Sequence, residues 1–333
     1  MSEIKKILLV ILAVSFLTGC KLGTFKMWKN DNIESKKKEQ IKALNDKLFM
    51  AITSNDVASI KELMSDKLLE KSGSNLEQLI YQVSNSFQSD NYRILDEYNV
   101  INSKINMNTT LPANLSNDND YVLKYVALNK ETYVSLLLPT GLNNDLLITV
   151  IYGKYDNQWR INILQFGQYS LFGKTAPEYY KLAKEKYEKS HLIDAINYIE
   201  ISQQCLRPSA SELFKYQKEK DINEFYEKVM KEIHSKFTLP LTLDNIKTKP
   251  KIFRIYPEMI DEGIYPMVFY LSEINLKDTM SLKFENEKVK IEVGKLFTGI
   301  DKDKKYVFYS VFNEFPNDNK MVERYGFIDR LTE

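Results

Sequence analysis

Few side chains in this chain could carry out covalent chemistry. The 333 residues include two cysteines, Cys20 and Cys205, and two histidines, His191 and His234. A catalytic thiol or hydroxyl needs a neighbouring base, most often an imidazole. Neither histidine lies in a motif that would pair it with Cys205, and the chain lacks a nucleophile elbow, a zinc-binding histidine pair and a phosphate-binding loop. The sequence therefore predicts no catalytic residue, no metal site and no cofactor.

Carboxylates are the one abundant group that could act as acids or bases. The chain has 45 Asp and Glu residues. Two carboxylates can drive hydrolysis, but such a pair is set by three-dimensional geometry and leaves no local spacing to recognise. The runs Asp118-Asn119-Asp120 and Asp301-Lys302-Asp303 lack the central Gly and terminal Glu of a calcium-binding loop, so both are interpreted as polar turns.

Cys20 ends a segment of a different kind. Lys5 and Lys6 precede an apolar stretch over 7–17, and Leu17-Thr18-Gly19-Cys20 follows. This pattern predicts a secretory signal peptide over 1–19, too short to span a bilayer. The four residues resemble the lipobox of bacterial lipoproteins, which implies cleavage before Cys20 and a diacylglycerol on its sulfur. An ordinary signal peptide with an incidental cysteine is the alternative. The resemblance implies a cell-envelope protein, periplasmic or surface-exposed, that is lipid-anchored to a bacterial membrane.

Charge and composition exclude several classes of function. Removing 1–19 takes away Lys5, Lys6 and Glu3, which leaves 44 basic and 44 acidic residues. A balanced chain does not attract a polyanion, so nucleic acid is not an expected partner. The chain has only 11 glycines, well below the usual share of about 7%. With Cys20 lipidated, Cys205 has no disulfide partner, and the fold must rely on its cores.

The next segments predict a tether, helices and then a sheet. Residues 20–37 are polar and lysine-rich, which indicates a lipidated tether whose lysines either stay in solvent or touch anionic headgroups. Apolar residues at helical spacing predict three helices between about 38 and 87. Alternation then predicts antiparallel strands near 92–105, 119–128, 131–138, 145–155 and 158–167. The helices need a surface to cover, and one face of this sheet supplies it.

This order of elements resembles the cone-shaped fold of nuclear-transport-factor-2-like domains. The resemblance covers residues 38–170 and includes a final hairpin, Gly153-x5-Trp159. It implies a cone between helices and sheet that either holds a small ligand or is filled by side chains. Tyr152, Trp159 and Ile161 are the candidate lining residues. We expect this domain to extend over 38–172.

The remaining chain predicts a connector and a second domain. Residues 173–238 return to helical spacing, and 176–206 resemble a single tetratricopeptide-like hairpin, interpreted here as a packing adaptor. Residues 239–333 predict a ββαββ unit, with a helix capped by Asp278 and ended near Gly299. Its strands are rich in aromatic residues, which either bind a partner or form the core: Tyr256, Tyr265, Phe269, Tyr270, Tyr306, Phe308, Tyr309, Phe312 and Phe315.

These patterns together predict an α+β protein with a lipid attachment point at Cys20. The expected function is that of a non-enzymatic binding or scaffolding module, with a protein, peptide or glycan as its partner. The alternative is a hydrolase or isomerase that uses carboxylates within the N-terminal cone. Such an enzyme requires at least two convergent ionisable groups in one open pocket.

Overall fold

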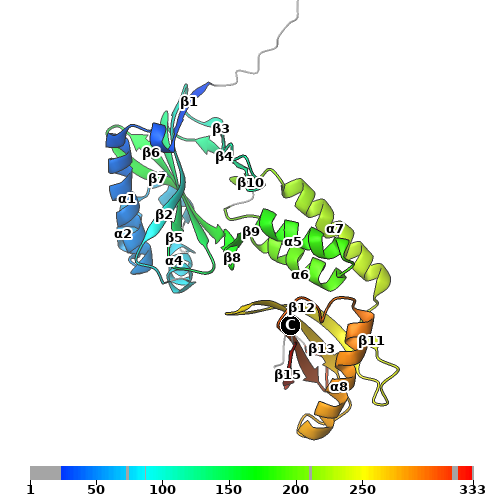
Figure 1. The fold of residues 1–333 in the computed structure, drawn as a ribbon. Helices are drawn as coiled ribbons and strands as arrows, with labels where there is room; N and C mark the ends of the chain where they lie inside the picture. The colour runs from blue at the N-terminus through cyan, green and yellow to red at the C-terminus, as the bar shows by residue number, and fades with distance from the viewer. Residues whose placement is uncertain (1–23, 73–74, 87, 210–211, 317–321, 332–333) are drawn as a thin grey trace, which may run out of the picture.

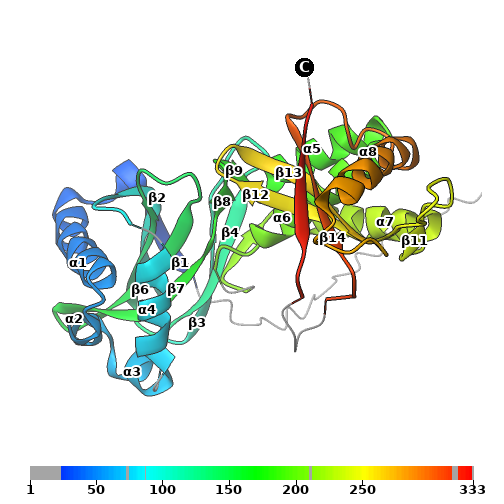
Figure 2. The ribbon, with the colours of Figure 1, turned by 90° about the horizontal axis from the view of Figure 1, so that it is seen from below.

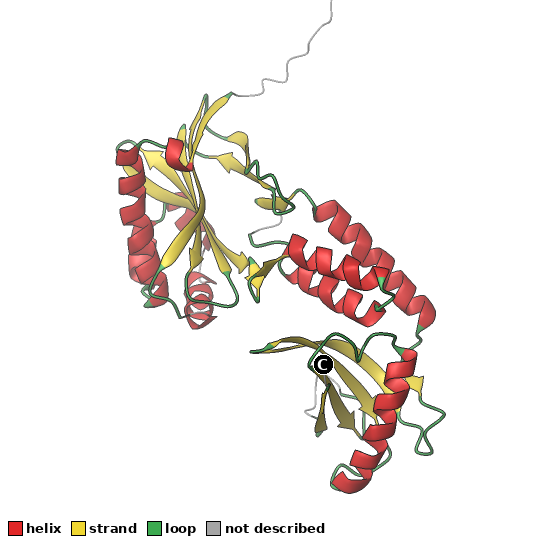
Figure 3. Cartoon of the chain, viewed as in Figure 1, coloured by secondary structure: helices red, strands yellow, loops and turns green. Residues whose placement is uncertain are grey.

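The computed structural model describes residues 24–72, 75–86, 88–209, 212–316 and 322–331. Eight α-helices and fifteen β-strands lie in these ranges, mostly in antiparallel sheets, so the predicted α+β class is confirmed. Helices and strands form an N-terminal unit, a helical connector and a C-terminal unit along one elongated molecule (Figures 1 and 3).

Four helices lie between the first and second strands of the main sheet, one more than predicted. They are α1 (Ser35–Thr53), α2 (Val57–Leu63), α3 (Asp66–Ser72) and α4 (Asn75–Ser86). Asp56 caps α2, since its carboxylate accepts a hydrogen bond from the Ser59 amide. The apolar stripes of α1, α2 and α4 cover one face of the sheet (Figure 2).

The main sheet has the order β1-β2-β5-β6-β7, and each strand pairs antiparallel with its neighbours. Its strands are β1 (Phe25–Lys29), β2 (Tyr92–Asn102), β5 (Glu131–Pro139), β6 (Leu146–Tyr155) and β7 (Gln158–Gln168). The meander predicted through 119–128 is wrong at that segment. Residues 121–127 form β4, which joins β3 (Met107–Pro112) and β10 (Phe214–Tyr216) in a separate three-stranded sheet.

The tether predicted over 20–37 is wrong over most of its described part. Phe25–Lys29 pairs with β2 as the edge strand of the main sheet, and α1 begins at Ser35. Backbone pairing with β2 and the partly buried Phe25, Met27 and Trp28 hold this strand, and Lys29 and Lys38 add ion pairs to buried carboxylates on β2. The lysines that suggested a solvated tether therefore attach the segment to the sheet.

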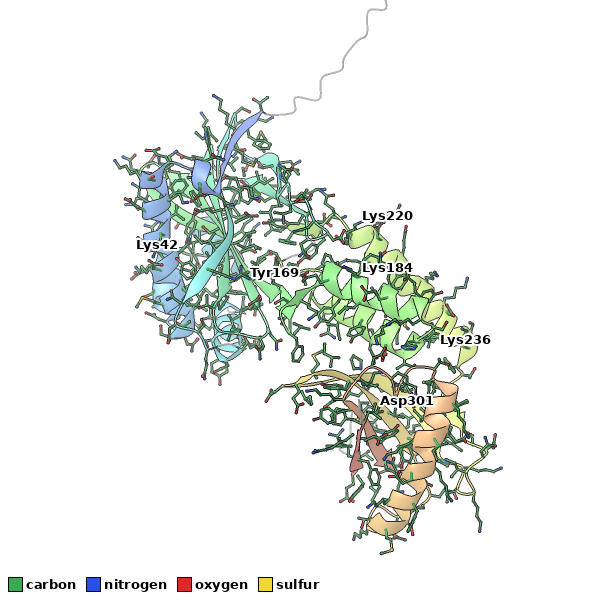
Figure 4. The ribbon with its side chains drawn as sticks, in the orientation of Figure 1. Lys42, Tyr169, Lys184, Lys220, Lys236 and Asp301 are labelled. Atoms are coloured by element: carbon green, nitrogen blue, oxygen red, sulfur yellow. The ribbon has the colours of Figure 1, made fainter. Side chains whose placement is uncertain are left out.

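The connector packs on the other face of the main sheet. It contains β8 (Ser170–Leu171), β9 (Lys174–Thr175), α5 (Ala176–Glu188), α6 (Leu192–Gln204), β10 and α7 (Glu219–Lys236). One hydrophobic core joins Leu136 of the sheet, Leu123 of β4 and Ile199 of α6, and Tyr169 lies between sheet and helices (Figure 4). The domain boundary predicted at 172/173 therefore falls inside a single core.

The C-terminal unit has the predicted ββαββ order. A short strand, β11 (Leu241–Thr242), precedes β12 (Lys251–Ile260), β13 (Gly263–Leu271), α8 (Thr279–Leu296), β14 (Tyr306–Phe312) and β15 (Tyr325–Arg330). The strands follow this order across one sheet, with β13 and β14 parallel because α8 crosses over between them. Asp278 caps α8 as predicted, by accepting a hydrogen bond from the Ser281 amide.

The connector and the C-terminal unit meet at a close junction. Ile193 of α6 belongs to the C-terminal core, and the neighbouring Asp194 carboxylate is 3.0 Å from Lys304 Nζ. Lys304 also donates to the Gly299 carbonyl at 2.7 Å. A Cβ atom at Gly299 would lie 2.2 Å from the His191 ring, so only glycine fits this contact.

Candidate functional site

The space between the helices and the main sheet is the first candidate site. The structure brings Tyr152, Trp159 and Ile161 together there, as the predicted cone lining requires. Tyr152 and Ile161 are fully buried, and Trp159 is 9% exposed. They pack against apolar side chains from α1, α2 and α4: Ile41, Leu48, Ile52, Ile60 and Ile80. The predicted lining residues are thus core residues, and side chains fill the space.

Polar atoms in this core are paired with one another. The Tyr152 hydroxyl donates to Asn45 Oδ1 at 2.8 Å, and Asn45 Nδ2 donates to Ser135 Oγ at 3.1 Å. Burial raises the pKa of Tyr152 well above its ordinary value, so the hydroxyl stays protonated. These bonds join α1, β5 and β6, and they give Tyr152 and Asn45 a structural role.

A buried carboxylate lies at the edge of the same core. Glu97 accepts a hydrogen bond from the Tyr133 hydroxyl at 2.6 Å and pairs with Lys38 at 3.0 Å. The hydrogen bond to Glu97 raises the pKa of Lys38, against a smaller opposing effect of burial. The neighbouring Lys37 pairs with Glu131 of β5 at 2.6 Å. The start of α1 is therefore attached to the sheet by two ion pairs.

The adjacent carboxylate, Asp96, faces the other side of the sheet. Its partners are Lys29 at 3.0 Å, Asn30 at 2.8 Å and the hydroxyl of Tyr121, which belongs to the connector-side core. Successive residues of a strand point to opposite faces. Asp96 and Glu97 are therefore two buried acids that share no cavity, and each is already paired with a lysine and a tyrosine.

Open concavities lie on the outside of the N-terminal unit. A cavity of about 710 Å³ forms where α2 and α3 meet the β2–β3, β4–β5 and β6–β7 turns. Its lining combines cations with exposed or half-buried apolar and aromatic side chains: Lys61, Lys67, Arg160, Ile105, Leu128 and Tyr155. Glu62 and Asp66 on the same rim are exposed carboxylates. This mixture suits a ligand or partner with acidic and apolar groups.

Arg160 separates this cavity from a second one of about 640 Å³. The Arg160 guanidinium donates to the Glu62 carbonyl and, at 3.0 Å, to Gln158 Oε1. The two cavities share Glu62 and Arg160, and the second adds Gln158, Trp159, Leu44 and Lys47. Sequence reasoning missed both cavities, because their walls come from segments far apart in the chain and no local spacing marks them.

The aromatic strands of the C-terminal unit are divided between two cores. Tyr270 and Tyr309 pack under α8. The opposite face of the sheet holds a second aromatic cluster that includes Tyr265, Phe269, Phe308 and Phe312, with Tyr256 and Tyr306 partly buried beside it. Phe315 is 52% exposed. Most of these aromatic residues are packing residues.

The cysteine predictions have separate outcomes. Cys20 lies outside the described residues, so its lipidation stays a prediction. Cys205 is buried, and burial raises the pKa of its thiol to about 12, which makes it an unreactive core residue. In the described ranges, no three His, Cys, Asp or Glu side chains are placed to hold a metal ion. The described helices also include none that is long and apolar enough to cross a membrane.

Comparison with known proteins found no similar protein. The chain matches no family model, no curated protein and no solved structure.

Proposed function

We propose that this chain is a lipid-anchored protein of the bacterial cell envelope that acts as a non-enzymatic binding or scaffolding module. One observation supports binding at the outer surface: the core between the helices and the sheet is filled by paired and packed side chains, while the cavities around Arg160 are open. A hydrolase or isomerase would need convergent acids in an open interior pocket, and Asp96 and Glu97 instead face opposite sides of the sheet.

Scaffolding is supported by the way the units are joined. The N-terminal sheet and the connector share one core, and the connector docks on the C-terminal unit through Ile193 and the Asp194–Lys304 ion pair. Such continuous packing holds surfaces of the two ends in a fixed relation. A protein, peptide or glycan is the partner class that an amphipathic outer cavity accommodates.

Mass spectrometry of the native protein tests the anchor. We expect an N-terminal peptide that begins at Cys20 and carries the mass of a diacylglycerol, and we expect Cys20→Ser to release the chain from the membrane fraction. An unmodified N-terminus other than Cys20 would contradict the proposal.

Site-specific photocrosslinking tests the outer binding surface. A photoreactive amino acid replaces Ile105, which is 55% exposed on the rim of the larger cavity. The matched control replaces Met50, which is 68% exposed on α1 and lines neither cavity. A discrete crosslinked product from position 105 alone would support the cavity as the binding surface. Equal products from both positions would count against it.

A further inference from the structure

The outer face of α8 carries large apolar side chains in contact with solvent. Met280, Phe284 and Ile291 are 72%, 67% and 59% exposed. They are spaced at i, i+4 and i+11, which places them on one stripe of the helix. The opposite stripe packs into the C-terminal core through Leu282, Val289 and Val293. The helix is therefore apolar on two faces, and its own domain covers only one of them.

Lysines border this exposed stripe. Lys283 and Lys288 flank it on either side of α8, and Lys247 lies on the neighbouring 243–250 loop. All three are exposed, and none forms an ion pair within the described chain. Glu287 lies on the stripe itself, three residues after Phe284 and four before Ile291, and its carboxylate is paired with Lys290 at 3.0 Å. The face therefore presents apolar groups and one paired carboxylate between lysines that have no ion-pair partner in the described chain.

We propose that this face of α8, defined by Met280, Phe284, Ile291 and their flanking lysines, docks on an anionic lipid surface. Apolar side chains of an interfacial helix enter the boundary between headgroups and acyl chains, while lysines extend their amines toward the phosphates. The stripe has cations on both sides, and Phe284, Lys288 and Lys247 also line a cavity of about 530 Å³ between α8 and the 243–250 loop. A planar anionic surface can contact both flanks at once, and this charge complementarity favours it over a small ligand.

The position of α8 gives the proposal a consequence for orientation, which rests on the lipid anchor proposed above. The first strand begins at Phe25, so five residues from Cys20 limit its separation from the anchor to about 17 Å. β1 and α8 lie at opposite ends of the molecule in the view of Figure 1. A chain held at both ends lies along the bilayer instead of projecting from it.

Vesicle flotation tests the docking face without the anchor. A chain of residues 21–333 keeps every described element but lacks Cys20. We expect it to float with phosphatidylglycerol vesicles at low salt and at least about tenfold less with phosphatidylcholine vesicles, and to be released by high salt. The triple variant M280S/F284S/I291S should lose at least about tenfold of the binding, and its exposed positions should leave the fold, checked by circular dichroism, intact.

The matched control changes exposed apolar residues elsewhere. Met50 and Tyr81 are 68% and 60% exposed on α1 and α4, so M50S/Y81S should bind vesicles like the parent chain. Absence of binding to phosphatidylglycerol would overturn the proposal, and so would a triple variant that binds like the parent. Failure of the anchor itself is detected separately, by the mass of the native N-terminus.

Discussion

At the scale of single residues, the paired polar atoms inside the N-terminal core do structural work. We predict that Tyr152→Phe lowers the free energy of unfolding by about 1–3 kcal/mol, because Asn45 Oδ1 is left buried without its donor. Urea denaturation measures the change. Tyr81→Phe is the control, since Tyr81 is an exposed tyrosine whose change should cost less than about 0.5 kcal/mol. Equal costs for both variants would contradict a structural role for the Tyr152 hydroxyl.

Glu131 predicts a dependence of stability on pH. Burial raises the pKa of its carboxyl, but hydrogen bonds from Lys37, Lys154 and Asn99 outweigh burial and hold the pKa below the ordinary 4.5. A carboxyl with a lowered pKa in the folded state stabilises the fold above its unfolded pKa, and this contribution is lost as pH falls through the folded value.

Glu131→Gln should therefore be less stable than the parent at about pH 7 and approach it at about pH 3. Denaturation curves across this range measure the difference. Glu70→Gln, at an exposed position of α3 with no ion pair to any described residue, should show no such convergence. A difference between Glu131→Gln and the parent that stays constant with pH would show that this carboxyl does not contribute in the expected way.

At the scale of elements, the junction depends on Gly299. Its φ of +83° lies in the left-handed region, and a Cβ there would collide with His191. Gly141 has a similar φ of +79° but no atom within 4 Å of an added Cβ. Gly141→Ala therefore measures the free-energy cost of a left-handed backbone conformation alone. We expect Gly141→Ala to cost about 1 kcal/mol. Gly299→Ala should cost about 1–3 kcal/mol more, measured by thermal or urea unfolding.

A second measurement separates junction opening from backbone strain. Displacement of His191 would loosen the contact between α6 and the C-terminal unit, so limited trypsin digestion should cut Gly299→Ala after Lys236 or Lys247 sooner than Gly141→Ala. If Gly299→Ala and Gly141→Ala had equal stabilities and equal digestion rates, the close approach of Gly299 to His191 would not stabilise the junction.

Elements with strong local signals could be predicted from the sequence, and elements held by distant contacts could not. Asp278, the 3.6-residue period and Gly299 marked α8 correctly, because caps and periodicity are local. Phe25–Lys29 was missed as a strand, since the carboxylates that hold it lie about 70 residues away on β2. The assignment of β4 to a separate sheet depends on Phe214 and Tyr216, which no nearby pattern reveals.

The candidate site was predictable only in part for the same reason. Tyr152, Trp159 and Ile161 share a core because they lie on neighbouring strands of one hairpin, which their alternation indicated. Whether that core is open or filled depends on how α1, α2 and α4 pack over it. The cavities at Arg160 need α1, α2, α3 and three turns to meet, so only the three-dimensional arrangement identifies them.

At the scale of the whole molecule, the shared core predicts which parts unfold together. Cys205 lies in the core that joins the main sheet to the connector, and its buried thiol reacts only when that core opens. In a Cys20→Ser background it is the single thiol of the chain. The rate at which a maleimide labels Cys205 therefore reports how often the N-terminal unit and the connector open together. The sequence alone predicted a domain boundary between them, at 172/173.

Two leucine truncations make this measurable, because both side chains are fully buried but in different cores. Leu136 of β5 lies in the shared core, and Leu282 of α8 lies in the C-terminal core. Each change to Ala should cost about 2–5 kcal/mol in its own core. Leu136→Ala should then speed Cys205 labelling at least about tenfold, although the two residues lie in segments predicted to be separate domains. Leu282→Ala should leave the rate near that of the parent. If Leu136→Ala did not change the labelling rate, the sheet and the connector would open independently. Their packing would then not hold the outer cavities and α8 in a fixed relation.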